Sequence, residues 1–247
     1  MQTEIIAHRG ASAYAPENTM YAFEEALTMH ADGIETDVHL TKDHIPVLMH
    51  DERINRTSNG KGFIRDYTYE QIIQFDIGSW FSSEFANATI VTLDQFLTWI
   101  KGTPLHAHIE IKNNKIDYPN IEAVVYEHIC KHQMEHRTTV SSFNFSSIQR
   151  FKELSRTIEI AYLTSKMSRK IRSSIKKDPV DALHMKHTLL KRQIIRCSKQ
   201  KELPLRIFTI NKISQMIRCF DVQVKGIFTD VPDIAYDMRC NWIQRKD

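Results

Sequence analysis

Two carboxylates stand two residues apart in Gly33–Leu40, a segment whose composition predicts a buried β-strand. Because side chains alternate between the two faces of a strand, Glu35 and Asp37 point the same way. Two like charges this close repel each other, and burial removes the water that would solvate them. They therefore need a cation or strong hydrogen-bond donors. The pair alone is compatible with a metal site and, equally, with a structural cluster paired to arginine.

A third carboxylate lies in another predicted strand, Leu105–Ile111. The same alternation puts His108, Glu110 and the following Lys112 on one face of it. A carboxylate and a lysine would thus face inward from a second strand.

Two histidines stand at the ends of two further predicted strands. His8 follows Glu4–Ala7, and His50 follows Pro46–Met49. A single histidine after an apolar run is more often structural. Barrel enzymes, however, build their active sites where the carboxyl ends of the strands converge. Both histidines, the three carboxylates, the lysine and Arg9 would meet on that rim.

The residue types indicate the chemistry of such a site. Three carboxylates without cysteine ligands or a histidine-rich spacing favour one hard divalent cation, Mg²⁺ or Ca²⁺, over zinc. Two histidines suit a general acid and a general base, and Arg9 and Lys112 suit a phosphate anion. The set predicts metal-assisted cleavage of a phosphate ester, in which one histidine activates the nucleophile and the other protonates the leaving alcohol.

The elements that would position these residues alternate along the chain. About eight β-type runs, with helical patterns between most of them, predict an α/β fold, a (β/α)8 TIM barrel. The candidate strands are Glu4–Ala7, Gly33–Leu40, Pro46–Met49, Leu105–Ile111, Thr138–Ser142, Ile158–Leu163, Val180–Met185, Leu205–Ile210 and Gly226–Thr229. The candidate helices are Thr19–His30, Leu93–Ile100, Ile121–Lys131, Ser146–Leu154, Leu189–Lys199, Ser214–Phe220 and Ile234–Arg239. We expect Thr19, Asp94 and Ser146 to lie at helix starts as N-caps. With nine strand candidates and no helix between Leu40 and Pro46, the strand count stays open.

One interval interrupts the alternation. Residues 52–90 contain only a short helical pattern at Tyr69–Phe75 and the aromatic pair Trp80 and Phe81. The interval is too short for a core of its own. We therefore expect a single domain over residues 1–247, with residues 52–90 as a small insertion between the early βα units, on the catalytic rim.

The bulk composition is typical of a globular protein, with 42% hydrophobic and 26% charged residues. A net charge of +3 from scattered Lys and Arg gives no case for nucleic acid, and we interpret the basic stretch from Ser168 to Lys177 as a solvated helix face. The four cysteines are widely spaced, no secretory signal is visible and no apolar run would cross a bilayer. These features predict a cytoplasmic enzyme with a small-molecule substrate and no stable membrane insertion. The oligomeric state stays open.

Several segments resemble the defining motifs of the glycerophosphodiester phosphodiesterase family. They are HRGASAYAPENT (His8–Thr19), GIETDVHLTKD (Gly33–Asp43), PVLMHD (Pro46–Asp51), GSWF (Gly78–Phe81), EIK (Glu110–Lys112), SSFN (Ser141–Asn144) and GIFTDVP (Gly226–Pro232). The resemblance covers nearly the whole chain and implies a (β/α)8 barrel with a small insertion. It implies metal-dependent hydrolysis of glycerophosphodiesters, such as glycerophosphocholine and glycerophosphoethanolamine, to sn-glycerol 3-phosphate and an alcohol, a step of glycerophospholipid catabolism.

The resemblance also implies roles for individual residues. The metal ligands would be Glu35, Asp37 and Glu110, the catalytic acid/base pair His8 and His50, and the phosphate-binding residues Arg9 and Lys112. Phe208 stands where the family usually has tryptophan, so it keeps an apolar pocket wall but lacks the indole donor. Trp80 is the other candidate for the substrate pocket, and Glu17 and Asn18 are expected to support the site.

Two alternatives remain at this stage. A lysophospholipase D or sphingomyelinase D-like lipid phosphodiesterase would need exposed apolar surface on the rim, which Trp80, Phe81 and Phe85 would supply. The lack of a signal peptide argues against such an extracellular lipase. A catalytically idle barrel used as a binding module is disfavoured by the intact ligand set and both histidines. The head group, the native metal, the assignment of acid and base, and the choice between water and the glycerol 2-hydroxyl as nucleophile stay open.

Overall fold

The centre of the molecule is a closed ring of parallel strands, seen in a computed structural model that describes residues 2–168 and 180–245. Within these residues, eight strands pair in parallel in the order β1-β2-β4-β5-β6-β7-β8-β9, and β9 pairs back to β1. The strands are β1 (Glu4–His8), β2 (Gly33–Leu40), β4 (His106–Ile111), β5 (Thr138–Ser142), β6 (Glu159–Thr164), β7 (Ala182–Lys186), β8 (Leu205–Phe208) and β9 (Gly226–Thr229). The predicted (β/α)8 barrel is confirmed.

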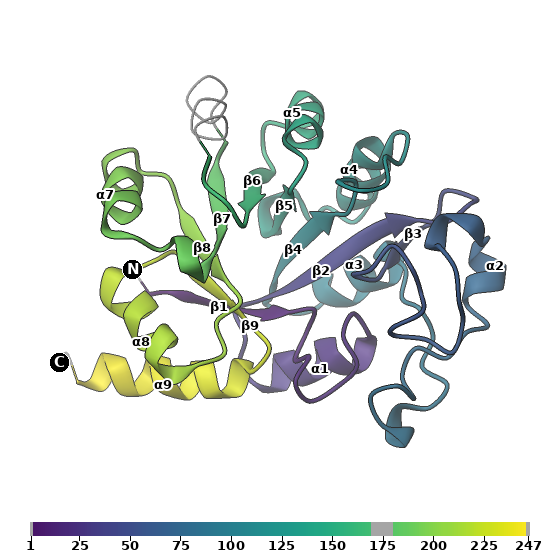
Figure 1. Cartoon of the computed structure of the whole chain (residues 1–247), viewed down its shortest axis with the longest axis horizontal. Helices are drawn as coiled ribbons and strands as arrows, with labels where there is room; N and C mark the ends of the chain where they lie inside the picture. The colour runs from purple at the N-terminus through teal and green to yellow at the C-terminus, as the bar shows by residue number, and fades with distance from the viewer. Residues whose placement is uncertain (1, 169–179, 246–247) are drawn as a thin grey trace.

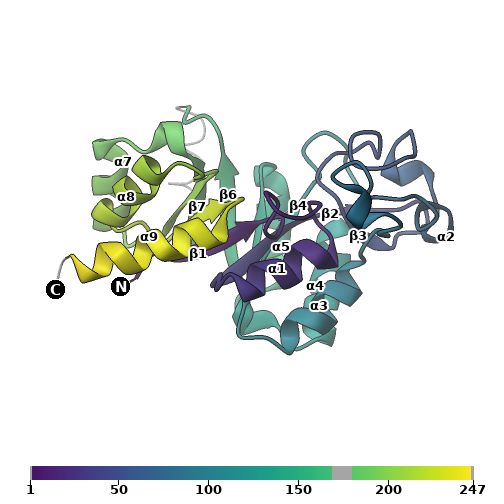
Figure 2. The ribbon, with the colours of Figure 1, turned by 90° about the horizontal axis from the view of Figure 1, so that it is seen from below.

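Helices surround the strands, as Figure 1 shows. They are α1 (Met20–Thr28), α3 (Leu93–Lys101), α4 (Ile121–Lys131), α5 (Phe145–Leu154), α7 (Arg192–Gln200), α8 (Ile213–Val222) and α9 (Pro232–Gln244). The last helix packs against the first strand, where Arg239 NH1 donates to the carbonyl of Thr3 at 3.0 Å, so both ends of the described chain lie on one side (Figures 1 and 2). No helix in the described part is long and apolar enough to cross a membrane. The basic stretch expected as a helix face lies, beyond Ser168, outside the described residues.

One of the nine strand candidates, Pro46–Met49, does not belong to the barrel ring. β3 (Pro46–Leu48) pairs antiparallel with β2, with Val38 opposite Leu48. A tight turn joins the two strands, and His44 in this turn has a positive φ of 63°. Because antiparallel neighbours need only a short turn, no helix is required between them.

The helix starts were predicted with partial success. Thr19 caps α1 as expected, accepting a hydrogen bond from the backbone N–H of Ala22. The predictions for Asp94 and Ser146 are wrong. Thr92 caps α3 in a capping box with Gln95, and Asn144 caps α5. In both places several residues with capping side chains follow one another, so composition alone does not select among them.

The segment between β3 and α3 carries a small apolar cluster of its own. It contains η1 (Ile64–Asp66), α2 (Tyr69–Ile72) and η2 (Ser83–Phe85). The buried members of the cluster are Val47, Met49, Ile54, Ile64, Ile72, Ile77, Ala88 and Ile90. The segment shares this cluster with β3 and with Met49, the residue that follows β3. It lies at one side of the barrel (Figures 1 and 2).

Candidate active site

A cavity of about 390 Å³ opens among the carboxyl ends of the barrel strands. Its volume falls in the range of small-molecule pockets. Most of the residues singled out from the sequence line it, namely His8, Arg9, Glu35, His50, Glu110 and Phe208. The strands thus bring together, on one rim, side chains that are up to 200 residues apart in sequence.

Three buried carboxylates meet beside this cavity. One oxygen each from Glu35, Asp37 and Glu110 lies within 4.8 Å of the others. The register of β2 and β4 places Asp37 directly beside Glu110. Burial, reinforced by the charges of the other two, raises the pKa of Glu35 well above its ordinary value, and burial also raises the pKa of Glu110. Such a set is stabilised by a cation, and its all-oxygen donors suit a hard divalent ion.

Two cationic side chains already contact these carboxylates. The Lys112 ammonium lies 2.9 Å from Glu110 Oε1 and 3.4 Å from Asp37 Oδ1. The guanidinium Nε of Arg9 lies 3.4 Å from Asp37 Oδ2. Burial opposes ionisation of Asp37, but Lys112 and Arg9 hold its pKa below the usual range. Lys112 is not among the residues that line the cavity, whereas Arg9 is.

The loop after β1 turns sharply to bring its side chains to the site. Arg9 and Gly10 both have positive φ, 60° and 82°. A side chain at Gly10 would meet the backbone of Ala22 at 2.6 Å, so glycine is required there. In this turn the backbone N–H of Arg9 donates to Glu35 Oε2 at 3.0 Å, which ties the β1 loop to β2.

His8 is paired with an aspartate from the other end of the chain. Its Nδ1 lies 2.7 Å from Asp230 Oδ1. Ser12 Oγ donates to the same oxygen at 3.1 Å, and Asn211 Nδ2 donates to Asp230 Oδ2 at 2.5 Å. Burial acts to raise the pKa of Asp230. These contacts outweigh burial and lower the pKa, and the His8 contact contributes most. The carboxylate fixes the orientation of the His8 ring.

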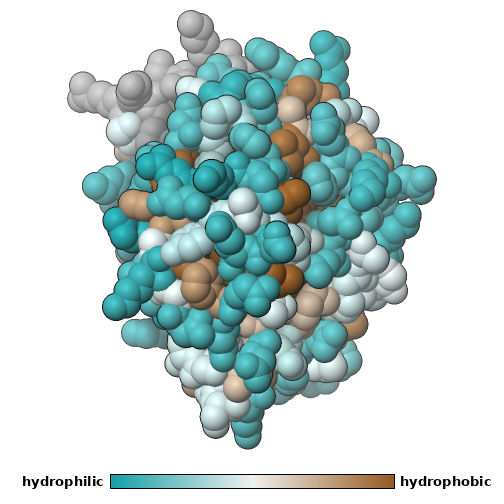
Figure 3. Space-filling model, turned by 90° about the vertical axis from the view of Figure 1, so that its right-hand side faces the viewer, coloured by the Kyte–Doolittle hydropathy of each residue, from teal (hydrophilic) through white to brown (hydrophobic). Residues whose placement is uncertain are grey.

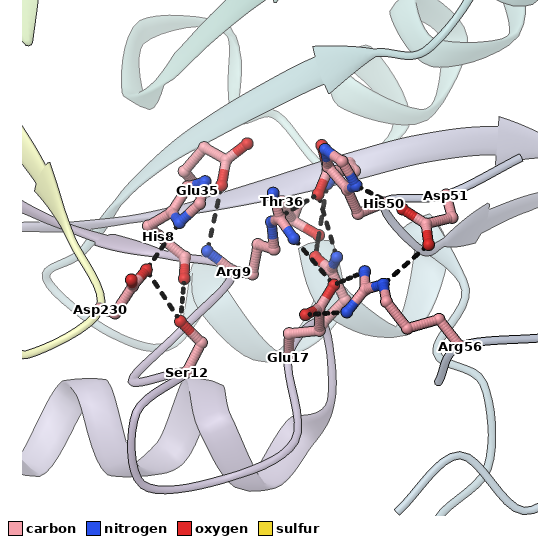
Figure 4. A network of polar contacts seen from close by, with 12 residues as sticks. His8, Arg9, Ser12, Glu17, Glu35, Thr36, His50, Asp51, Arg56 and Asp230 are labelled. Atoms are coloured by element: carbon pink, nitrogen blue, oxygen red, sulfur yellow. Dashed lines mark hydrogen bonds and ion pairs between the residues drawn. The ribbon is translucent and has the colours of Figure 1, made fainter. Parts of the chain in front are cut away.

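His50 also has an aspartate partner, which is connected through further ion pairs to Arg9 in the β1 loop (Figure 4). His50 Nδ1 lies 2.7 Å from Asp51 Oδ1. Arg56 donates to Asp51 Oδ2 at 2.7 Å and to both oxygens of Glu17 at 2.7 and 2.8 Å. Glu17 in turn accepts from Arg9 NH1 at 2.9 Å. A continuous chain of charged contacts therefore joins the His50 loop, the insertion and the β1 loop.

Asn18 supports the Asp37 carboxylate, in keeping with the supporting role expected from the sequence. It has a positive φ of 58°. Its Nδ2 donates to Asp37 Oδ2 at 3.1 Å, and its Oδ1 accepts from the Thr36 hydroxyl at 2.7 Å. The amide thereby adds a hydrogen bond to the carboxylate oxygen that Arg9 also approaches.

The two candidates for the substrate pocket are placed differently. Phe208 lines the cavity, and its ring meets that of Phe143 edge-on with centroids 6.0 Å apart. Trp80 is not among the lining residues. Its indole N–H donates to the carbonyl of Ile77 at 2.8 Å, and its ring packs edge-on against Phe81.

Sequence reasoning assigned no role to Asp51, Asp230 and Arg56. Asp51 and Asp230 lie inside the quoted segments PVLMHD and GIFTDVP, so a signal was present but their partners were not evident. Glu17 was expected only as a supporting residue in general terms. Arg56 lies in a turn of the insertion, outside its short helices, and no pattern in the sequence marks it.

Comparisons with known proteins agree with this geometry. Residues 8–234 match the model of the glycerophosphoryl diester phosphodiesterase family. A glycerophosphodiester phosphodiesterase of Bacillus altitudinis is 39% identical over 96% of this chain and 98% of its own length. One of Caldanaerobacter subterraneus subsp. tengcongensis is 35% identical over 96% and 98%. A solved phosphodiesterase of Oleispira antarctica, in complex with the product sn-glycerol-3-phosphate, superposes with a TM-score of 0.86 at 26% identity, covering 96% of both chains.

Proposed function

The chain belongs to the glycerophosphoryl diester phosphodiesterase family, and from this premise we propose that it hydrolyses glycerophosphodiesters to sn-glycerol 3-phosphate and an alcohol. Membership makes it a phosphoric diester hydrolase. The observation that carries the proposal is the meeting of two histidines and three carboxylates at one cavity. The product bound by the Oleispira antarctica phosphodiesterase supports a small-molecule substrate of this kind.

Glu35, Asp37 and Glu110 would hold one divalent metal ion, Mg²⁺ or Ca²⁺. Three buried carboxylate oxygens within 4.8 Å of one another and the raised pKa of Glu35 support this fit. A bound cation would reduce the repulsion between the carboxylates and favour their charged forms. When bound, the ion supplies Lewis acidity and fixes the phosphoryl oxygens. Two protein cations, Arg9 on the cavity wall and Lys112 in contact with Glu110 and Asp37, would add positive charge for the phosphate.

His8 and His50 would act as the general acid and general base. Each ring engages an aspartate through Nδ1 at 2.7 Å, which leaves Nε2 for the reacting oxygens. The two rings reach the cavity from β1 and from the end of β3, on either side of β2. In-line displacement at phosphorus needs entering and leaving oxygens on opposite sides, and two flanking proton-transfer groups match that need.

We further propose that residues 1–247 act as one barrel domain, with residues 52–90 as an insertion on the rim. The Arg56 contacts support this proposal, because they tie the insertion to Asp51 and Glu17. The aromatic residues of the insertion give less support to the lipid-diesterase alternative. The rings of Phe81 and Phe85 meet edge-on, and Phe85 also meets Tyr21 edge-on. The face that carries the insertion is mostly hydrophilic, with scattered apolar areas (Figure 3).

A metal-depletion assay tests the proposed function. Turnover of glycerophosphocholine and glycerophosphoethanolamine should vanish in EDTA and return with Mg²⁺ or Ca²⁺. The rates on the two substrates should lie within about two decades of each other, since small differences in a loosely held group are worth only a few kcal/mol. Full activity in dialysed, chelated enzyme would exclude the metal. Strict preference for a long-chain lysolipid would favour the lipid diesterase.

A further inference from the structure

One side of the cavity carries a positive charge that the proposed mechanism does not use. Lys186, the last residue of β7, lines the cavity and is exposed to solvent. Within the described residues, no ion pair or hydrogen bond engages its ammonium group. The other cation on the cavity wall, Arg9, is already paired with Glu17 and Asp37. Lys186 is therefore available to an incoming ligand.

Two imidazoles beside Lys186 also have free hydrogen-bonding capacity. His184 is 1% exposed and lines the cavity, and its Nε2 has no partner among the described groups. His187 lines the cavity too, and its buried Nδ1 likewise lacks a protein partner. Burial lowers the pKa of His184 well below its usual value, and the charge of Arg206 adds to this effect. A neutral ring of this kind can donate to, or accept from, a ligand oxygen. Buried polar atoms without partners are uncommon and require an explanation.

Among the residues that the structure describes, no side chain on this side of the cavity would compensate a cationic ligand. Of the described residues that line the cavity, the carboxylates are Glu35 and Glu110, and both belong to the proposed metal site. The rings of Phe143, Phe208 and Phe228 offer aromatic faces, but phenylalanine is weaker than tryptophan in binding cations. A quaternary ammonium would also have to lie near the Lys186 charge. Electrostatics thus favours a ligand group that is negative or rich in oxygen.

The substrate can supply such a group from one half only. The glycerol 3-phosphate half carries no charge beyond the reacting phosphate, so any second charge belongs to the alcohol. On this basis, and resting on the proposed function, we infer that the Lys186 side of the cavity selects glycerophosphodiesters whose alcohol carries an anionic group, such as a carboxylate or a second phosphate. Esters of choline and ethanolamine would be the poorer substrates.

Three substrates of matched size test this inference. They are the glycerophosphodiesters of 3-hydroxypropanoate, 1,3-propanediol and 3-aminopropanol, three-carbon alcohols that end in a carboxylate, a hydroxyl and an ammonium. The wild-type kcat/KM should fall in that order. Lys186→Gln should lower the value for the anionic ester and raise that for the cationic ester by about fivefold each, the scale of an exposed charge contact. Lys186→Glu should reverse the order, and added salt should shrink all of these differences.

A control variant and a binding measurement make the result decisive. Lys199→Gln removes an exposed lysine of α7 that does not line the cavity, and it should leave the anion-to-cation ratio as in wild type. Calorimetry with non-hydrolysable phosphonate analogues of the three esters measures the same preference without turnover. If no ester is cleaved yet the analogues bind in the expected order, the proposed function is wrong and the subsite stands. If Lys186→Gln changes the ratio no more than Lys199→Gln does, or if the wild-type enzyme prefers the ammonium ester, the subsite is wrong.

Discussion

The two proposed catalytic histidines have similar partners that are supported in different ways. Each imidazole contacts an aspartate at 2.7 Å. Asp230 is held by uncharged donors, Ser12 and Asn211, from elements next to the barrel closure. Asp51 is held by the guanidinium of Arg56, which comes from the insertion.

The two aspartates that contact the histidines are therefore held in place by different kinds of interaction. An aspartate held by neutral groups keeps its full negative charge for its imidazole, whereas one paired with arginine shares that charge. The His8 pair depends on the closed barrel, because β1 and β9 must be neighbours for it to form. The His50 pair joins two adjacent residues, and only the support of Asp51 by Arg56 depends on how the insertion folds. The two halves of the proposed acid/base machinery can therefore be perturbed independently.

Removing either histidine should have the largest effect. His8→Ala and His50→Ala should each lower turnover of glycerophosphocholine by roughly 10²–10⁴-fold, the usual contribution of a positioned acid or base. Metal affinity, measured by calorimetry, should change little. An aryl phosphodiester, whose leaving group needs no protonation, should rescue only the variant that lost the acid. Near-wild-type rates in both alanine variants would show that neither histidine is catalytic.

Replacing the aspartates should have an intermediate effect that compares the two pairs directly. In Asp230→Asn and Asp51→Asn the amide can donate to Nδ1 and so favour the wrong tautomer. We expect losses of about 10–10²-fold in kcat, the scale seen for hydrogen-bond partners that orient a functional imidazole. Steady-state kinetics across pH would measure both. Equal activity in wild type and both variants would mean that these contacts are only structural.

Replacing Arg56 should affect only the His50 half of the proposed acid/base pair. Arg56→Gln should lower kcat by about two- to tenfold, with a change in the pH profile, because Asp51 and Glu17 lose their shared partner. Arg53→Gln is the matched control, since Arg53 lies in the same segment and stacks over Phe63. If both variants lose activity equally, the effect is a general loosening of the insertion and not the loss of one contact.

The smallest expected effect is on acid stability. Partial burial acts to raise the pKa of Asp51. Hydrogen bonds from Arg56 and His50 outweigh burial and lower this pKa from 3.8 to about 2. A carboxylate with a lowered native pKa stabilises the fold above the unfolded pKa and loses that contribution as the pH falls through the native value. The free energy of unfolding of Arg56→Gln should therefore be lower than that of wild type at pH 6, by about 1 kcal/mol or less.

Denaturant unfolding at several pH values would check this prediction. The gap between Arg56→Gln and wild type should close as the pH falls from about 4 to 2, the window between the two pKa values. A gap that stays constant over this range would show that Arg56 does not lower the pKa of Asp51 or of its other partner, Glu17.

Much of the fold and part of the site follow from local sequence. The period of two along Gly33–Leu40 is sufficient to place Glu35 and Asp37 on one face, because alternation is a property of any extended strand. Alternating strand and helix patterns predict the barrel, and barrel closure then brings strand ends such as His8 together. These inferences needed only neighbouring residues and one general rule of architecture.

Other features are decided by contacts between distant residues. Asp230 reaches His8 across 222 positions, and Arg56 reaches Glu17 across 39. Lys112, expected to contact phosphate, contacts Glu110 and Asp37 in the described structure. The sequence contains each of these residues, but a local pattern does not specify which side chains become neighbours. That depends on the closure of the barrel and on the path of an irregular insertion, so only the tertiary structure identifies the partners.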